Sequence, residues 1–304
     1  MKFCVVIPLY NKAPYIKRAI NSVLNQTIQD FEIIVVNDGS TDNGQEVVEG
    51  IQDPRIRLIN QPNQGVSVAR NRGIEEAHYP FIAFLDADDE WKPEFLAHIQ
   101  RLYNNFSDCG AYATSYEIID PKNKVSYPDL NNIPPEPWIG IIPNLFQLMQ
   151  HNSPFYTSSI AIPRDVLLLL NGFPEGIQQG EDRILWTRLG IKYPVAFSPS
   201  PQAIYHREAT NRACHTFQPE PETANYIDKM LINNEVPVAL IHDIRDYRAY
   251  LVIQKAHLMV IEDHADLARP LLRSIGKNKK YSVQILKWYL LSLMPYKVIK
   301  VLRK

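Results

Sequence analysis

Cysteine is scarce in this sequence: Cys4, Cys109 and Cys214 are the only three among 304 residues, and they lie far apart. Such wide spacing gives neither a disulfide framework nor the spacing of a metal site. It favours a reducing compartment, so we expect a cytoplasmic protein. Long apolar runs are also missing, so the sequence predicts neither a signal peptide nor a transmembrane helix. The net charge of -1 excludes no class of partner.

Acidic residues are absent after Asp266, although the same stretch holds ten lysines and arginines. Within it, residues 281–294 are apolar enough for a helix but too short to span a bilayer. Flanking lysines, with Trp288 and Tyr289, suit a helix lying on an anionic membrane surface, peripheral to the inner face of the membrane. Packing on the rest of the chain or on a homodimer partner is the alternative. No nucleic-acid-binding motif accompanies these basic residues, so nucleic acid is not a predicted partner.

Short apolar runs alternate with helix-like segments over the first hundred residues. The expected strands are 3–9, 31–36, 56–59 and 81–85. The expected helices are 15–24, 40–50 and 65–77, and the second of them has Ser40 or Thr41 as its cap. Apolar strands separated by helices predict an α/β, Rossmann-like fold: a mostly parallel sheet flanked by helices on both faces.

The chain beyond residue 100 divides into an irregular part and a helical part. Residues 120–143 are rich in Pro and Asn and predict a long loop, while short helices are expected at 165–170 and 183–189. Further helices are expected at 226–232, 247–260, 267–275 and 281–294, the last ended by Pro295. The sequence therefore predicts a C-terminal helical extension after the α/β part.

Polar side chains follow three of the expected strands, at residues 10–11, 37–38 and 86–89. In open parallel sheets, ligands bind at the carboxyl ends of the strands. There, Asp38 could accept hydrogen bonds from a nucleotide base or ribose, or it could serve only in a turn and helix cap.

Three carboxylates, Asp86, Asp88 and Asp89, lie close together after the strand at 81–85. They repel one another unless a cation neutralises them. Their hard oxygen atoms suit Mn²⁺ or Mg²⁺, ions that keep positions open for water and phosphates. A solvated acidic turn is the alternative.

Two further groups have open interpretations. Glu181 and Asp182 begin an expected helix, where carboxylates often only cap, but either could act as a general base towards a hydroxyl. His206 could bind a metal, a phosphate or an acceptor, or it could be structural.

Seven segments occur in the order typical of one enzyme family. They are residues 5–11, 22–27, 31–42, 65–73, 84–91, 172–175 and 180–182. Together they resemble the motifs of the family 2 glycosyltransferases, which have the GT-A fold. The resemblance spans about residues 3–207 and does not cover the basic tail.

The resemblance implies a role for each matching residue. The nucleotide would be bound by Pro8, Tyr10, Asp38, Arg70 and Asp86, with Asp38 at the base and Asp86 at the ribose. The metal would be bound by Asp88 and, by a looser match, His206. Asp182 would be the catalytic base, with Glu181 positioned beside it.

The resemblance also implies an activity: metal-dependent, inverting transfer of a sugar from a nucleoside-diphosphate donor. We expect a UDP-sugar, a saccharide or lipid-linked acceptor, and a role in surface polysaccharide synthesis. Residues 1–100 would be the sugar-nucleotide-binding half, 101–215 the acceptor-binding and catalytic half, and 216–304 the helical extension. A non-catalytic sugar-nucleotide or glycan-binding protein of the same fold is the alternative. A nucleotidyltransferase lacks support, because no glycine-rich phosphate loop occurs near the N-terminus.

Overall fold

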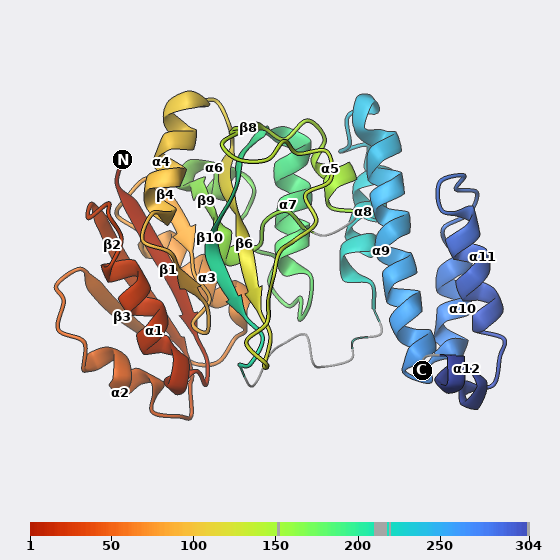
Figure 1. The fold of residues 1–304 in the computed structure, drawn as a ribbon, viewed down its shortest axis with the longest axis horizontal. Helices are drawn as coiled ribbons and strands as arrows, with labels where there is room; N and C mark the ends of the chain where they lie inside the picture. Colours follow the sequence, from red (N-terminus) through yellow and green to blue (C-terminus); the bar gives the residue numbers. More distant parts are fainter. Residues whose placement is uncertain (151–152, 210–217, 219, 303–304) are drawn as a thin grey trace. The chain divides into compact units, whose positions relative to one another are not determined.

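The computed structural model describes residues 1–150, 153–209, 218 and 220–302. The chain divides into two units, Met1–His215 and Thr216–Lys304, of which the first contains a sheet and the second is helical (Figure 1). The C-terminal helical extension predicted from the sequence is thus present.

Among the described residues, one sheet of ten strands organises the first unit. Its strands are β1 (Phe3–Leu9), β2 (Phe31–Asp38), β3 (Ile56–Gln61), β4 (Phe81–Phe84), β5 (Glu90–Trp91), β6 (Ala111–Ile119), β7 (Val125–Ser126), β8 (Gly140–Ile141), β9 (Ile160–Pro163) and β10 (Val195–His206). Their order is β3-β2-β1-β4-β9-β6-β10-β5, with β7 beside β6 and β8 beside β10. β1 to β4 are parallel, as are β6 and β10, whereas β9 runs antiparallel to both of its neighbours. The prediction of a mostly parallel sheet is confirmed.

Helices cover both faces of this sheet (Figure 1). They are α1 (Ala13–Leu24), α2 (Gly44–Glu49), α3 (Val66–Glu76), α4 (Phe95–Asn105), α5 (Leu145–Leu148), α6 (Arg164–Leu169) and α7 (Glu181–Lys192), with a 3-10 turn η1 (Thr157–Ser159). Because successive strand residues point to opposite faces, the odd-numbered residues of β1 pack with α1 and α4. The even-numbered Val6 faces α3. Burial on both sides explains the continuous apolar run in β1.

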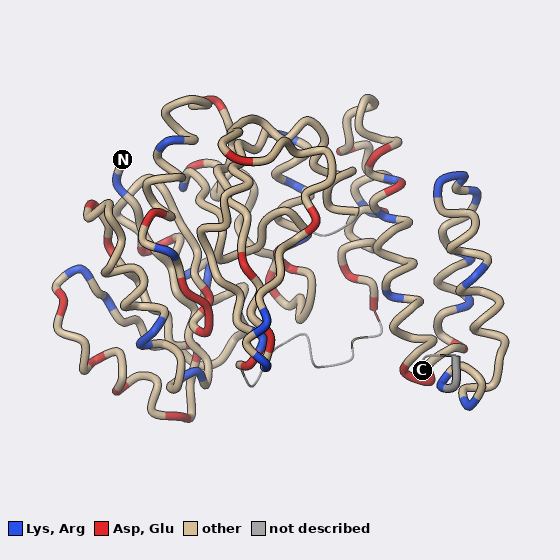
Figure 2. Tube along the Cα trace, viewed as in Figure 1, with Lys and Arg blue, Asp and Glu red and all other residues tan. Residues whose placement is uncertain are grey.

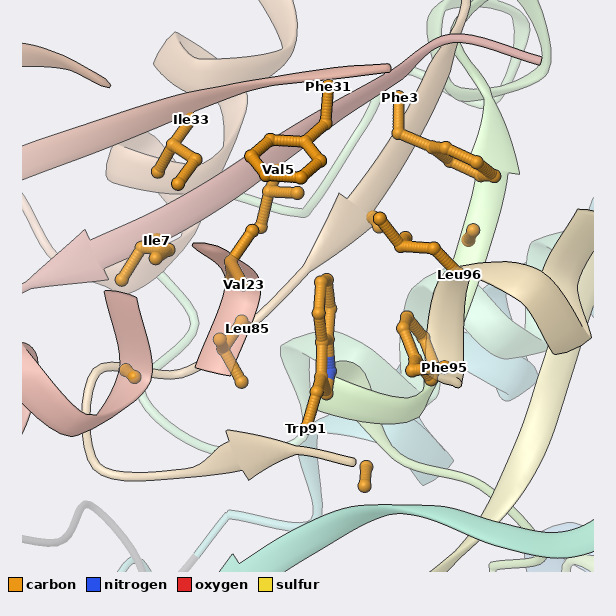
Figure 3. Close-up of a cluster of buried hydrophobic side chains, with 14 of the residues drawn as sticks. Phe3, Val5, Ile7, Val23, Phe31, Ile33, Leu85, Trp91, Phe95 and Leu96 are labelled. Carbon is orange, nitrogen blue, oxygen red and sulfur yellow. The ribbon is translucent and has the colours of Figure 1, made fainter. Parts of the chain in front are cut away.

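The core between β1, β2, α1 and α4 contains large side chains (Figure 3). Trp91 and Phe95 stack with ring centroids 4.2 Å apart. Phe3, Leu96 and Val23 are fully buried in the same cluster. This packing fixes the strand ends from which the polar residues of the first unit project.

Gly73 is the point of closest approach between α3 and β1. A Cβ atom there would lie 2.3 Å from Val6 Cγ1 and 3.1 Å from Val6 Cβ, so the helix or the strand would have to move. We expect Gly73→Ala to lower the free energy of unfolding by about 1–3 kcal/mol, because overpacking outweighs the helix propensity of alanine.

Urea unfolding measures this effect, and Gly50→Ala is the matched control. Gly50 has an ordinary φ of -72°, and its added Cβ would be 3.4 Å from the nearest atom. The control should change stability by less than about 0.5 kcal/mol. Equal losses in the two variants would contradict the close approach of α3 to β1.

The second unit is built around its longest helix. Its elements are α8 (Glu222–Ile232), the 3-10 turn η3 (Val238–Leu240), α9 (Ile241–Ile261), α10 (Ala265–Arg273), α11 (Ser282–Leu291) and α12 (Tyr296–Leu302). α9 contacts each of the other helices. The sequence predicted that the helix at 281–294 would be ended by Pro295, and this is wrong. The helix found there, α11, already ends at Leu291. Pro295 instead directly precedes α12, a position that tolerates a residue without an amide hydrogen. Over the residues that the structure describes, no helix has both the length and the apolar content needed to cross a bilayer.

Candidate active site

The strand ends bring the predicted polar residues to one edge of the sheet. Asp38 is the last residue of β2, and Tyr10 follows β1, its neighbour. The segment Asp86 to Asp89 follows β4, on the other side of β1. The three polar segments therefore share one edge, as expected for parallel strands.

Asp89 turns inward and fixes the acidic turn. Its side chain accepts hydrogen bonds from Ser158 Oγ (2.7 Å) and from the His206 amide (3.2 Å). Burial, with the charges of Asp88 and Asp86, raises the pKa of Asp89 well above its usual value. Ser158 Oγ also accepts a hydrogen bond from the Asp86 amide (3.0 Å). Asp89 therefore shapes the turn, and this leaves Asp86 and Asp88 nearer the surface.

Asp88 lies between two cationic side chains. Lys12 Nζ is 2.7 Å from its Oδ2 atom, and Arg18 donates to its backbone carbonyl at 2.5 Å. The Asp88 side chain is 16% exposed. The ammonium group of Lys12 therefore provides part of the positive charge that closely spaced carboxylates need.

Arg70 connects the acidic turn to the start of α7. Its buried guanidinium donates to Asp86 Oδ1 (2.8 Å) and to Glu181 Oε1 (2.9 Å), and it lies over the Phe173 ring, 4.9 Å from the centroid. Burial opposes the charge of Arg70, but Asp86 and Glu181 outweigh it and raise its pKa. Two predicted groups that are far apart in the sequence thus meet at one side chain.

Glu181 and Asp182 occupy the first turn of α7, after Gly180 with its φ of 88°. Glu181 is held by Arg70, and burial, together with the charge of Asp182, raises its pKa. Asp182 accepts a hydrogen bond from the Arg183 amide (2.6 Å) and is only partly buried. Glu181 is therefore paired with the Arg70 guanidinium, whereas the Asp182 carboxylate accepts from a backbone amide of its own turn.

His206 ends β10 beside the acidic turn. Its Nε2 atom is 3.1 Å from Glu90 Oε1, and its Nδ1 atom is 3.0 Å from Glu208 Oε1. The hydrogen bond from His206 lowers the pKa of Glu90. Both ring nitrogens thus have carboxylate partners, so a bound ion would compete with Glu90 or Glu208 for the ring.

Asp38 is buried and already accepts three hydrogen bonds. The donors are Gln61 Nε2 (2.7 Å) and the amides of Gln64 (2.9 Å) and Gly65 (2.8 Å). These hydrogen bonds fix the segment 61–65 that connects β3 to α3. Since a carboxylate has about four acceptor positions, one remains for a ligand donor.

Pro8 and Tyr10 differ in accessibility. Pro8 is buried in β1, where it pairs with Val36 of β2. Tyr10 is 46% exposed. Of the two residues, only Tyr10 presents a side chain that a nucleotide base could stack on.

Sequence reasoning missed four residues that hold the site together. Lys12, Arg18 and Ser158 contact the acidic turn as described above, and Trp91 donates from Nε1 to the Ser158 carbonyl (2.6 Å). Lys12 directly follows the motif at residues 5–11, and Trp91 is the last residue of the motif at residues 84–91. Ser158 lies outside every motif, so no sequence pattern indicated it.

The carboxylate oxygens of the acidic turn suit a divalent ion whose coordination shell is completed by phosphate. In the described part of the chain, no three or more His, Cys, Asp or Glu side chains converge to hold a metal. Mg²⁺ and Mn²⁺ at nucleotide sites often take one or two carboxylates and complete their shell with phosphates and water. The residues present, Asp88 first, fit such an ion only with the diphosphate as co-ligand.

Two solved structures share this fold, which is the GT-A fold. S. aureus TarS in complex with UDP-GlcNAc has a TM-score of 0.62 at 17% identity, over 95% of this chain and 89% of that one. A mannosyltransferase from Pyrobaculum calidifontis, in complex with GDP-Man and Mn²⁺, has a TM-score of 0.63 at 17% identity, over 99% of this chain and 83% of that one. The predicted fold class is confirmed.

The chain belongs to glycosyl transferase family 2, whose family model matches residues 4–168. The family resemblance inferred from the motifs is confirmed. An uncharacterized glycosyltransferase of Nostoc sp. is 45% identical over 127 residues, which are 41% of this chain and 39% of the relative. One of Rickettsia bellii is 34% identical over 200 residues, 63% of this chain and 26% of the relative. Each match thus covers less than half of the relative's length.

Proposed function

We propose that the chain is a metal-dependent, inverting glycosyltransferase that moves a sugar from a nucleoside-diphosphate donor to an acceptor hydroxyl. One observation carries the proposal: Arg70 joins Asp86 of the acidic turn to Glu181, the neighbour of Asp182. One buried cation, Arg70, would then link the turn that binds the donor to the helix that carries the base.

We infer a UDP-sugar as the donor. Tyr10 and Asp38 offer an exposed ring and one remaining acceptor position, a pair suited to stacking on and hydrogen-bonding a base. UDP-GlcNAc in TarS and GDP-Man in the Pyrobaculum mannosyltransferase support a nucleotide-sugar on this fold.

Asp88 would hold Mn²⁺ or Mg²⁺, with His206 as a further candidate ligand. Mn²⁺ in the Pyrobaculum mannosyltransferase supports this assignment. When bound, the ion would stabilise the negative charge that develops on the departing diphosphate. Lys12, paired with Asp88, would add a positive charge on the same side.

Asp182 would act as the general base. Its carboxylate would take the proton of the acceptor hydroxyl as that oxygen forms a bond to the anomeric carbon and the bond from this carbon to the diphosphate breaks. A single displacement inverts the anomeric configuration. Arg70 would orient Glu181 and thereby the first turn of α7. We propose a saccharide or lipid-linked acceptor and a role in surface polysaccharide synthesis, which rest on the family resemblance.

A panel of UDP-, GDP- and dTDP-sugars, with release of nucleoside diphosphate as the readout, tests the proposal. We expect one donor to be turned over with Mn²⁺, and chelation or Asp88→Asn to lower the rate by about 100-fold or more, because an electrostatic stabiliser of the leaving group is lost. Asp165→Asn is the control, since Asp165 is exposed in α6.

Two outcomes would contradict parts of the proposal. Turnover that survives chelation would overturn metal dependence. Binding of one donor without turnover of any, measured by calorimetry, would favour the alternative of a non-catalytic sugar-nucleotide-binding protein.

A further inference from the structure

Helix α11 has two apolar faces, and only one of them is packed. Ile285, Trp288 and Leu291 pack against the core of the second unit, and Trp288 stacks on His257 with centroids 4.1 Å apart. The core that they cover consists of Ile253, Ala256, Met259, Val260, Ala268, Leu272 and Ile299. The packed face thus accounts for only some of the apolar residues within 281–294.

The other face of α11 is exposed. Val283, Leu286 and Leu290 are 75%, 58% and 50% exposed, and their spacing of three and four residues puts them on one side of the helix. Leu293, in the turn after α11, is 58% exposed. Tyr296, Val298 and Met294, exposed at 36%, 43% and 40%, continue the apolar surface towards α12. We call this surface the α11 face. A continuous apolar surface of this kind marks an interaction site.

The α11 face is bordered by lysines. Lys279 precedes α11, Lys287 lies beside Leu286 and Leu290 on the helix, and Lys297 follows Pro295; all three lysines are exposed. Over the described residues, none of these three has an ion pair with a carboxylate. Figure 2 shows basic residues along α10 to α12 and no acidic residue after Asp266. The border therefore has one sign of charge.

We propose that the α11 face docks on an anionic lipid bilayer. Apolar side chains would enter the boundary between headgroups and acyl chains while the lysines contact anionic headgroups. At 1.5 Å per residue, the ten residues of α11 extend about 15 Å, half of a hydrocarbon core, so the helix lies in the plane of the surface.

Charge complementarity favours a bilayer over a second copy of the chain. Two copies meeting through this face in a symmetric dimer would bring their own lysines together. Trp288, which the sequence suggested as a membrane contact, is mostly packed inward, so the exposed leucines carry the apolar contact instead. The proposal does not depend on the proposed glycosyl transfer.

Co-sedimentation of the full chain with vesicles tests the proposal. Neutral phosphatidylcholine vesicles are compared with vesicles that also contain phosphatidylglycerol, at low and at high salt. We expect binding to the anionic vesicles and a loss of binding as salt rises, because the lysine contribution is screened.

Two double variants separate the apolar and the basic parts of the face. L286E/L290E and K287E/K297E should each weaken partitioning to anionic vesicles by about tenfold or more, through lost insertion and lost charge attraction respectively. I232E/V238E is the matched control, because Ile232 and Val238 are 78% and 87% exposed in the same unit but lie outside the α11 face. It should bind as the parent does. All of the substituted residues are exposed, and unchanged urea midpoints verify the fold.

Three results would overturn the proposal. They are equal binding to neutral and anionic vesicles, unchanged binding of both α11 variants, and a dimer by light scattering that L286E/L290E dissociates while no vesicle binding is seen. The last result would assign the α11 face to a second copy of the chain.

Discussion

Asp182→Asn is expected to lower kcat by about 10²–10⁴-fold, because a positioned general base contributes about that much. Asn keeps the shape of the side chain at the first turn of α7 but cannot take up a proton. The neighbouring Glu181 cannot replace it, since its carboxylate is held by Arg70. Donor affinity should stay within about threefold of the parent, because the lost interaction belongs to the transition state.

Steady-state turnover and calorimetric donor binding, measured on the same preparation, separate these effects. Glu175→Gln is the matched control: Glu175 is an exposed carboxylate in the segment before α7, near Asn71 Nδ2 at 3.3 Å. Its kcat should change by about twofold or less. If Asp182→Asn keeps its turnover, or loses donor binding and turnover to the same extent, Asp182 is not the base.

The parallel half of the sheet could be predicted from the sequence because it is buried on both faces. β1, β2 and β4 read as continuous apolar runs, and their predicted and observed bounds differ by two residues at most. β6, β9 and β10 were not predicted. β10 contains Pro199 and Pro201, and its register shifts between Ser198 and Pro201, so its residues resemble those of a loop.

Tertiary contacts also explain the wrong helix cap. Ser40 or Thr41 was expected to cap the second helix, but α2 begins at Gly44. Ser40 Oγ instead accepts from the Asn11 amide (3.1 Å), and Asp42 accepts from the Gly44 amide (3.0 Å). A capping residue type can serve any nearby amide, and the sequence does not say which one.

The site residues were recognised one by one, but the interactions among them were not. Arg70 and Glu181 are 111 positions apart, and only the fold brings them to 2.9 Å. Their pairing suggests that Arg70 has a structural role as well as the nucleotide role implied by the family resemblance. This structural role leads to the second large expected effect.

Arg70→Met is expected to lower the free energy of unfolding by about 3–5 kcal/mol, because it leaves two carboxylates, one of them well buried, without their common partner. The Glu181 side chain is 14% exposed and that of Asp86 28%, so Glu181 would bear most of the cost. Arg70→Lys should recover part of the loss, because an ammonium group keeps the positive charge but cannot hydrogen-bond Asp86 and Glu181 in the geometry of the guanidinium.

Arg72→Met is the control for removing an arginine from an exposed ion pair. Arg72 pairs with Glu76 at 2.7 Å, and the two side chains are 47% and 30% exposed. Its loss should cost about 0–1 kcal/mol. Urea unfolding of the three variants and the parent gives the comparison.

The pH dependence of the Arg70→Met deficit tests its cause. Burial, with the charge of Asp182, already raises the pKa of Glu181, and without Arg70 it should rise further. A carboxyl group whose pKa is higher in the folded state binds more protons there, so stability is greater at low pH and is lost as pH rises through the folded-state pKa. The deficit should therefore be smaller at about pH 5 than at about pH 8. A deficit that is the same at both would instead assign the loss to Arg70 packing on Phe173, and the uncompensated carboxylates would not be its cause.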